Sequence, residues 1–176
     1  MQDEPRSDRL TGFPPVIGSR ARVLILGSMP GAASLVKNEY YGLPHNAFWR
    51  IMGDLYGFDV NLSYEQRLKM IVTSGVALWD VLVSCYRRGS LDSAIDERTA
   101  KTNDFRMLFR EHGAITHVFF NGKKAASIFE KRVLPGFENE HSRKEFVTLP
   151  STSPAFASMT FENKREKWSI VKVASG

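Results

Sequence analysis

The sequence contains few of the cysteine and histidine residues that bind metal ions or form covalent crosslinks. Cys85 is its only cysteine, so an internal disulfide is impossible and a cysteine-based metal cluster is not expected. The four histidines, His45, His112, His117 and His141, are scattered without the spacing of metal ligands. We therefore expect a protein without a bound metal.

Long apolar runs are also missing. No stretch approaches the length of a membrane span, and the first residues, Met-Gln-Asp-Glu-Pro-Arg, lack the apolar core of a signal peptide. These features predict an intracellular, cytoplasmic protein that makes no membrane contact.

Two glycine-rich cofactor motifs are absent as well. The loop Gly27-Ser28-Met29-Pro30-Gly31 follows an apolar strand but lacks the glycine spacing of a dinucleotide-binding fingerprint. No Gly-Lys-Ser/Thr sequence is present to form a phosphate-binding loop. A phosphate-cradling cofactor is therefore disfavoured, and we expect no cofactor.

The chain does contain enough apolar sequence for one core, together with a mild excess of positive charge. Its 176 residues are 43% hydrophobic, which fits a single domain. We expect residues 1–20 to form a polar arm, residues 21–176 to form the domain, and the protein to be a monomer. The net charge of +5 permits nucleic-acid binding without requiring it.

Apolar strands alternate with amphipathic helices along the chain. Four strands are expected, at residues 23–27, 76–83, 117–120 and 146–149. Helices are expected at residues 47–57, 64–73, 103–112, 123–133 and 160–171. This alternation predicts an α/β fold in which helices cover both faces of a parallel sheet.

Polar or glycine-rich residues follow each of these strands. Ligands of parallel sheets bind at the carboxyl ends of the strands. The loops expected there are residues 27–31, 80–84, 121–122 and 150–155. Residues 84–102 form a further polar, irregular segment, and a connection of this length is uncommon unless it serves a site.

Aromatic and amide side chains crowd into residues 40–49, Tyr-Tyr-Gly-Leu-Pro-His-Asn-Ala-Phe-Trp. Rings combined with a few polar groups suit a pocket that stacks on a flat heterocycle and reads its edge. An aromatic part of the core is the alternative.

Five segments closely resemble the uracil-DNA glycosylase superfamily, and most closely its hypoxanthine-DNA (deoxyinosine) glycosylase branch. They follow the family's order at residues 27–31, 40–49, 75–80, 119–122 and 149–154. The resemblance implies a three-layer α/β/α sandwich with a central four-stranded parallel sheet. It also implies a monofunctional enzyme that flips a deaminated base out of DNA and hydrolyses its N-glycosidic bond without a metal or cofactor. Hypoxanthine is the expected base, with uracil or xanthine as extras.

Asn46 is the catalytic residue that the resemblance suggests. In several relatives the first loop holds an Asp or Asn that positions the attacking water, whereas here it carries Ser28, Met29 and Pro30. Asn46 would orient this water and stabilise charge by hydrogen bonding, because an amide is not a strong base. The alternative is a helix N-cap, since Asn46 directly precedes Ala47.

Asp80 ends the second strand, where some relatives carry an asparagine that reads the base. Its carboxylate would accept a hydrogen bond from N1–H of hypoxanthine, or it would activate the water. A surface carboxylate that caps the next loop is the alternative.

The other base-binding candidates lie in three segments. Residues 27–30 would border the base, and either Tyr41 or Phe48 would stack on it while the other belongs to the core. Asn121 is either a pocket amide or, with Gly122, the turn that leaves a strand.

The segment Pro150-Ser-Thr-Ser-Pro-Ala155 is expected to contact the DNA backbone through Ser151, Thr152, Ser153 and Pro154. Phe156 would then wedge into the base stack. An ordinary serine-rich turn, with Phe156 packed against the last helix, is the alternative.

Four other functions compete with this interpretation. A mismatch-directed uracil or thymine glycosylase would fit the superfamily, but the first loop lacks the asparagine that favours it. A nucleoside hydrolase would not need residues 151–153, and a non-catalytic DNA-binding module would not depend on Asn46. A Schiff base at Lys123 would produce a strand-cleaving enzyme, but the resemblance argues for simple hydrolysis.

Overall fold

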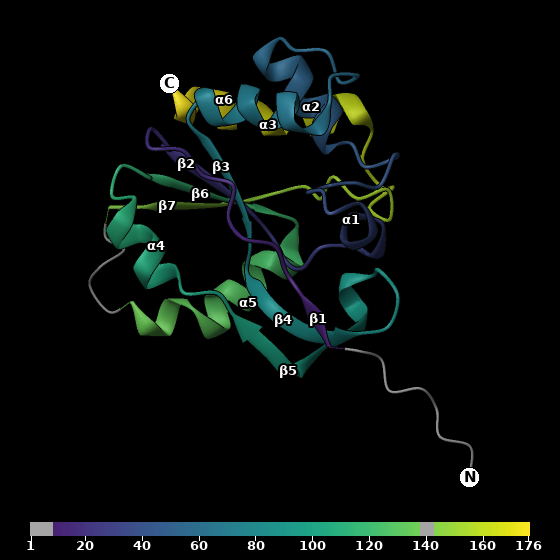
Figure 1. Ribbon diagram of the computed structural model, residues 1–176, viewed down its shortest axis with the longest axis vertical. Coiled ribbons are helices and arrows are strands. Elements are labelled where there is room, and N and C mark those ends of the chain that lie inside the picture. Colours follow the sequence, from purple (N-terminus) through teal and green to yellow (C-terminus); the bar gives the residue numbers. More distant parts are fainter. Residues whose placement is uncertain (1–8, 138–142) are drawn as a thin grey trace.

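The computed structural model describes residues 9–137 and 143–176. Its central element is a four-stranded parallel sheet (Figure 1). Its strands lie in the order β3 (Val76–Asp80), β2 (Val23–Gly27), β6 (His117–Asn121) and β7 (Glu145–Leu149). All three neighbouring pairs are parallel. β2 and β3 are buried along their whole length, as expected for continuous apolar strands covered on both faces.

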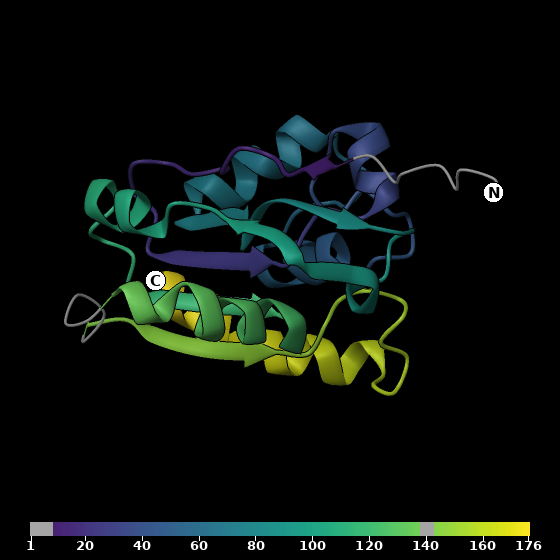
Figure 2. The same cartoon turned by 90° about the horizontal axis from the view of Figure 1, so that it is seen from below.

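Helices cover both faces of this sheet (Figure 1, Figure 2). One face packs against α2 (Phe48–Tyr56), α3 (Tyr64–Thr73) and α6 (Phe161–Ser175). The other face packs against α4 (Phe105–Glu111), α5 (Lys123–Arg132) and a second sheet. Alternate residues of each strand enter the two cores. The predicted α/β/α sandwich is therefore confirmed.

The expected strand at residues 76–83 is in fact two strands that belong to different sheets. β3 ends at Asp80, and β4 (Leu82–Arg87) joins a three-stranded antiparallel sheet with β1 (Leu10–Thr11) and β5 (Ile95–Thr102). The Val81 N–H donates to the Gly27 carbonyl at 2.8 Å, and the Leu82 N–H donates to the Ser28 carbonyl at 3.1 Å. The chain leaves the central sheet at these two residues. Apart from Asp80, residues 76–83 are all apolar because β3 and β4 both bury side chains in the same core.

The irregular segment at residues 84–102 is largely the β4–β5 hairpin. The short 3-10 helix η1 (Asp92–Ala94) interrupts the connection between the two strands. A second 3-10 helix, η2 (Leu134–Gly136), follows α5. The hairpin sequence reads as polar because only one side of β5 faces the core: Ile95 and Ala100 are buried, while the other residues are partly or fully exposed.

The described part of the N-terminal segment lies along both sheets. Leu10 and Thr11 pair with β4, and Val16 forms a bridge with Leu78 of β3. The Trp79 indole N–H donates to the Phe13 carbonyl at 3.0 Å. These contacts join residues 9–20 to the domain.

Several helices begin or end at residues whose types favour helix caps. Thr160 accepts a hydrogen bond from the Asn163 N–H at the start of α6, and Asp104 accepts one from Met107 at the start of α4. Gly57 ends α2 in a left-handed conformation. The six-residue helix α1 (Ala32–Lys37), which follows the first loop, was not expected. Among the described residues, no helix is long and apolar enough to cross a membrane.

Gly57 gives a test of local stability. Its φ is +75°, and an added Cβ would meet no atom of the described residues within 4 Å. The Gly57→Ala variant should therefore lose about 1 kcal/mol of unfolding free energy from backbone strain alone, measured by urea denaturation. Gly113→Ala is the matched control, because Gly113 also has open space but no positive φ. Equal losses in the two variants would contradict this account.

Candidate active site

A cavity of about 540 Å³ opens at the carboxyl ends of the central strands. Segments that are distant in the sequence meet there. The lining consists of residues 27–34, Tyr40, Tyr41, Leu43, Asn46, Asp80, residues 90–93, Asn121 and residues 151–156. Every site residue expected from the sequence lines this cavity except Phe48.

Asp80 lies at the end of β3 and is only 4% exposed. Its Oδ2 has no hydrogen-bond partner among the described residues. Burial raises the pKa of Asp80 to about 7, the negative charge of Asp92 adds to this rise, and Arg87 opposes it. Asp80 is therefore a buried carboxyl group beside the cavity and not a surface carboxylate. With this pKa, its neutral and charged forms are both present near neutral pH.

Gly27 makes room for this carboxyl group. It faces Asp80 at the last register position of β2 and β3, and a Cβ at Gly27 would overlap with Asp80 Oδ1. A glycine at this position is therefore a steric requirement of the buried carboxyl group.

The first loop is held in place from the β4–β5 hairpin. The buried Arg87 donates from Nη2 to the Pro30 carbonyl at 2.6 Å and from Nη1 to the Met29 carbonyl at 3.4 Å. Ser28 donates from its hydroxyl to Asp92 Oδ1. One wall of the cavity is thus built by a part of the chain that sequence reasoning did not assign to the site. The length and polarity of residues 84–102 were the only signal.

Tyr41 and Phe48 have different positions. Phe48 is fully buried in the core, and its ring stacks on Tyr41 with 3.8 Å between the ring centroids. Tyr41 lines the cavity, and its hydroxyl has no hydrogen-bond partner among the described residues. Burial, followed by the charge of Asp80, raises the pKa of the Tyr41 hydroxyl, which stays neutral.

The backbone at Tyr41 is strained and is fixed on both sides. Its φ of +55° is uncommon for a residue with a large side chain. The Tyr40 N–H donates to the Tyr64 hydroxyl at 2.9 Å, and the Gly42 N–H donates to the Ser34 hydroxyl at 3.0 Å. Such strain persists only where the surroundings impose it, and it is common at functional sites.

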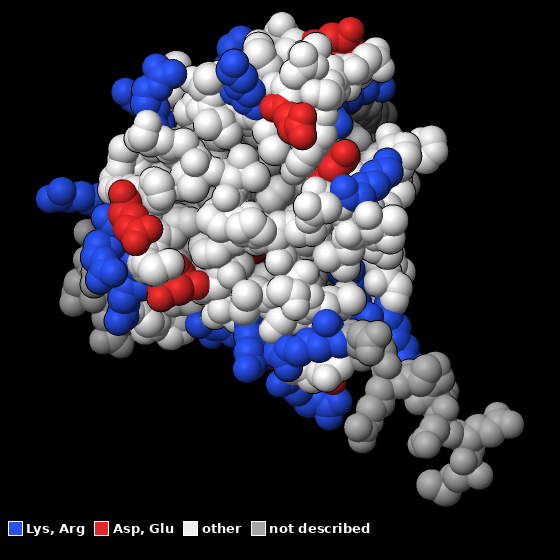
Figure 3. Space-filling model, viewed as in Figure 1, with Lys and Arg blue, Asp and Glu red and all other residues white. Residues whose placement is uncertain are grey.

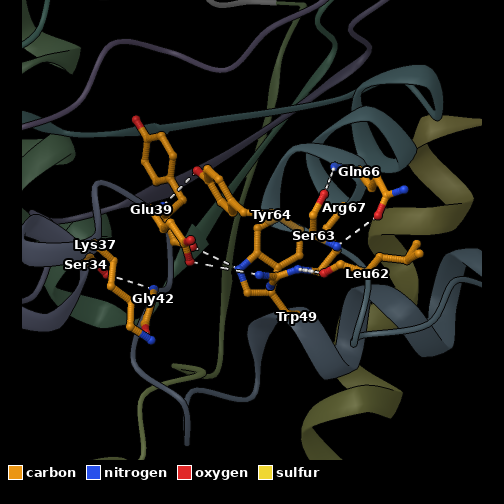
Figure 4. A network of polar contacts seen from close by, with 11 residues as sticks. Ser34, Lys37, Glu39, Gly42, Trp49, Leu62, Ser63, Tyr64, Gln66 and Arg67 are labelled. Carbon is orange, nitrogen blue, oxygen red and sulfur yellow. Dashed lines mark hydrogen bonds and ion pairs between the residues drawn. The ribbon is translucent and has the colours of Figure 1, made fainter.

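Figure 4 shows the network of polar contacts that anchors the α1–α2 connection, residues 38–47, to α1 and α3. In Arg67 of α3, Cζ lies 4.6 Å from the Trp49 ring centroid and Nη2 lies 4.0 Å from Oε2 of Glu39. Lys37 of α1 donates to the Gly42 carbonyl at 2.9 Å. Residues 39–42 and Trp49 are therefore held from two helices, which fixes the backbone on both sides of Tyr41.

Asn46 lies at the partly exposed rim of the cavity. Its Oδ1 accepts the Phe48 N–H at 3.0 Å, so the side chain also stabilises the start of α2, although Ala47 occupies the N-cap position. This hydrogen bond limits the rotation of the amide. Asn46 therefore orders the helix start without being its N-cap, and it also lines the cavity; its catalytic role stays a prediction.

Asn121 and Thr152 form a reciprocal pair. Asn121 Nδ2 donates to the Thr152 hydroxyl at 2.8 Å, and the Thr152 N–H donates to Asn121 Oδ1 at 2.9 Å. The Thr152 carbonyl also accepts the Ala47 N–H at 3.0 Å. Both groups of the Asn121 amide are engaged by Thr152, which is 1% exposed, so this pair joins the ends of β6 and β7 to the start of α2.

The loop that follows β7 is ordered by its own hydroxyls. Ser151 accepts the Ser153 N–H and Ser153 accepts the Ala155 N–H, each at 3.2 Å. Pro154 is exposed at the tip of this loop.

α6 supports the same loop through Lys164. The buried Lys164 donates from Nζ to the Phe156 carbonyl at 2.7 Å and lies 5.2 Å from the Phe156 ring centroid. Burial lowers the pKa of this lysine. Phe156 is partly exposed. It lies beside α6 through its contacts with Lys164, and it also borders the cavity.

Within residues 9–137 and 143–176, no group of three or more His, Cys, Asp or Glu side chains is placed to hold a metal ion.

Comparisons with known proteins agree on one family. The family model described as the uracil DNA glycosylase superfamily matches residues 14–173. A hypoxanthine DNA glycosylase of Methanosarcina acetivorans is 34% identical over 161 residues, which is 91% of this chain and 96% of that protein. A protein of the same name from Methanosarcina barkeri is 40% identical over 115 residues, 65% of this chain and 72% of its own.

A solved structure has the same fold. It is a solution NMR structure from Methanosarcina acetivorans, provisionally described as a uracil DNA glycosylase. It aligns with a TM-score of 0.77 at 34% identity and covers 94% of this chain and 97% of its own.

The buried carboxyl group predicts an unusual pH dependence of stability. Because the pKa of Asp80 is higher in the folded than in the unfolded protein, the folded state binds more protons between about pH 4 and 7, and stability falls as the pH rises. Relative to wild type, the Asp80→Asn variant should gain on the order of 3 kcal/mol of unfolding free energy between pH 4 and pH 8.

Urea denaturation at several pH values measures this difference, and any constant effect of the new amide cancels. Asp54→Asn, which removes an exposed carboxylate from α2, is the control and should follow the wild-type curve. Parallel curves for wild type and Asp80→Asn would contradict the burial argument.

Proposed function

Because this chain belongs to the uracil DNA glycosylase superfamily, we propose that it is a monofunctional DNA repair glycosylase that excises deaminated bases, hypoxanthine first. The damaged nucleotide would swing out of the duplex into the cavity, and water would replace the base to leave an abasic site. The observation that carries the proposal is the buried, unpaired Asp80 carboxyl group in a cavity that Asn46 also borders.

Base recognition is assigned to Asp80 and Tyr41. Hypoxanthine offers N1–H as a donor, and Asp80 Oδ2 is an acceptor with no partner among the described residues. Phe48 covers one face of the Tyr41 ring, so the base would stack on the opposite face. The main chain of residues 27–30 approaches the base closely, because Gly27 carries no side chain.

The chemistry requires stabilisation of two developing charges. Cleavage of the N-glycosidic bond leaves positive charge on the sugar and negative charge on the departing base. Asn46, at the partly exposed rim, would orient the water below the sugar through its amide. The first loop, Ser28-Met29-Pro30, contains neither an amide nor a carboxylate, which disfavours the mismatch-directed uracil or thymine glycosylase.

Binding of the DNA backbone is assigned to the loop at residues 151–156 and, at longer range, to basic residues of β5 and α5. The hydroxyls of Ser151 and Ser153 already accept backbone N–H groups, which leaves their O–H groups to donate to phosphates. Figure 3 shows Lys and Arg side chains gathered over β4 and β5 on one face of the molecule. The exposed basic residues of β5 and α5 are Arg98, Lys101, Lys123, Lys131 and Arg132. Positive charge there would attract DNA.

The catalytic assignment is tested with Asn46→Ala. Loss of a positioned amide should slow the single-turnover excision of hypoxanthine by about 100-fold or more. The measurement uses end-labelled duplexes with one deoxyinosine, deoxyuridine or deoxyxanthosine, and alkali then cleaves the abasic sites. Asn61→Ala, an exposed asparagine between α2 and α3, is the matched control.

Each rival function predicts a different result in this assay. Near-normal excision by folded Asn46→Ala would refute the assignment. Cleavage without alkali, together with borohydride trapping, would indicate a strand-cleaving enzyme. Base release from free deoxyinosine at the rate seen in the duplex would indicate a nucleoside hydrolase.

The DNA-binding loop is tested with the double variant Ser151→Ala/Ser153→Ala. Loss of two hydroxyl contacts to phosphates should weaken binding about tenfold for all duplexes alike. Fluorescence anisotropy on duplexes with and without deoxyinosine measures this effect, and Ser158→Ala, in the next turn, is the control. A loss confined to the deoxyinosine duplex would contradict backbone binding.

A further inference from the structure

We propose that Asp92 is a second catalytic carboxylate, which the β4–β5 connection brings to the first loop to accept a proton from the attacking water. The inference rests on the proposed function, because it concerns the water that attacks the sugar. Asn46 can orient this water, but an amide does not take up its proton.

The first supporting observation is the contact between Asp92 and the first loop. The hydroxyl of Ser28, which is 5% exposed, donates to Asp92 Oδ1 at 2.5 Å, although the two residues lie 64 positions apart. A carboxylate can accept about four hydrogen bonds. The bond from Ser28 therefore orients Asp92 and leaves it able to accept another from water.

The second observation is that Asp92 belongs to a pinned segment. The Ala32 N–H donates to the Ser90 hydroxyl at 3.0 Å, and Arg87 Nε donates to the Gly89 carbonyl at 2.9 Å. The Arg87 guanidinium also holds the Pro30 carbonyl. Asp92 is therefore attached to the site by contacts on both its own segment and the first loop, and such fixed geometry favours catalysis.

The third observation is the depth of the polar groups in the cavity. Asp80 is almost fully buried, whereas Asn46 and Asp92 line the same cavity and are both partly exposed. A base that enters from the duplex goes in ahead of its sugar. Asp80 thus lies at the depth of the base, and Asn46 and Asp92 lie at the depth of the sugar and the water.

The charges around the cavity separate the roles of the two carboxyl groups. The charge of Asp92 acts on Asp80 of β3, Tyr41 of the α1–α2 connection and Cys85 of β4, and the positive charge of Arg87 acts on Asp80 and Cys85 in the opposite direction. The negative charge of Asp92 is one cause of the raised pKa of Asp80. Asp80 is buried and Asp92 is partly exposed, and two carboxyl groups in such different surroundings commonly divide the acid and base roles.

The step balances without a metal or cofactor. The bond between C1′ and the base nitrogen breaks, and its electron pair leaves with the base. The water oxygen forms the new bond to C1′, and its surplus proton passes to Asp92 and then to solvent. The base takes up one proton, which the neutral Asp80 or solvent supplies.

The test compares Asp92→Asn with Asp92→Ala. The asparagine variant keeps an oxygen that accepts the Ser28 hydroxyl but cannot take up a proton, and the alanine variant loses both properties. Asp96→Asn is the matched control, because Asp96 lies in the same hairpin outside the cavity lining and pairs with Arg98. Single-turnover excision is measured from pH 5 to pH 9 on the three duplexes, together with duplex affinity and thermal unfolding.

Both Asp92 variants should excise about 100-fold more slowly than wild type at pH 8, with duplex affinity within about twofold. Because the charge of Asp92 raises the pKa of Asp80, a change of the rate that follows the ionisation of Asp80 should move to lower pH in Asp92→Asn. The fold-loss should be equal for every base that wild type excises, because Asp92 acts on the water and not on the base.

Three results would overturn the proposal. A rate for Asp92→Asn within about threefold of wild type, with only Asp92→Ala slow, would assign Asp92 to docking of the hairpin. A loss confined to one base would make it a base reader. No release of any base by wild type would refute the proposed function and this inference together. Wild-type release of uracil alone would refute only the preference for hypoxanthine, and an equally slow Asp92→Asn would still support the role of Asp92.

Discussion

The site depends on one constraint, the burial of the Asp80 carboxyl group at the point where β3 ends. Gly27, the residue that faces it across the sheet, has to lack a side chain. An unpaired oxygen in a nearly inaccessible position reduces stability unless a ligand or a proton satisfies it. That such a group is retained at the carboxyl edge of a parallel sheet is consistent with a role in ligand recognition.

The second constraint is that the loops around Asp80 are fixed before any ligand binds. The Asn121–Thr152 pair joins the ends of β6 and β7, and the Thr152 carbonyl ties both to the start of α2. Lys164 supports the next loop from α6, and two flanking hydrogen bonds hold Tyr41 in its strained conformation. Groups that are already in position do not have to be ordered during the reaction, and this favours the transition state.

The connection between the strands of the small antiparallel sheet builds one wall of the cavity. The chain turns out of the central sheet after Asp80, runs along the first loop as β4, and returns as β5. The end of β4 places Arg87 on the carbonyls of the first loop, and the connection to β5 places Asp92 on the hydroxyl of Ser28. A first loop without a carboxylate thereby lies against a carboxylate from a distant part of the chain.

The sequence by itself determined the central sheet, most of the helices and the edge of the sheet at which the site lies. Apolar strands such as Val23–Gly27, caps such as Asp104 and Thr160, and the helix end at Gly57 are encoded by residues close together in the chain. The family motifs likewise indicated the superfamily that the family model matches.

Only the tertiary structure decided that residues 76–87 form two strands, that Phe48 is core and Tyr41 lines the cavity, and that Asn121 holds Thr152. It alone brought Asp92 to Ser28. The reason is physical: propensity and periodicity act over a few residues, whereas the contacts that build this cavity join side chains that become neighbours only when the two sheets and their helices pack.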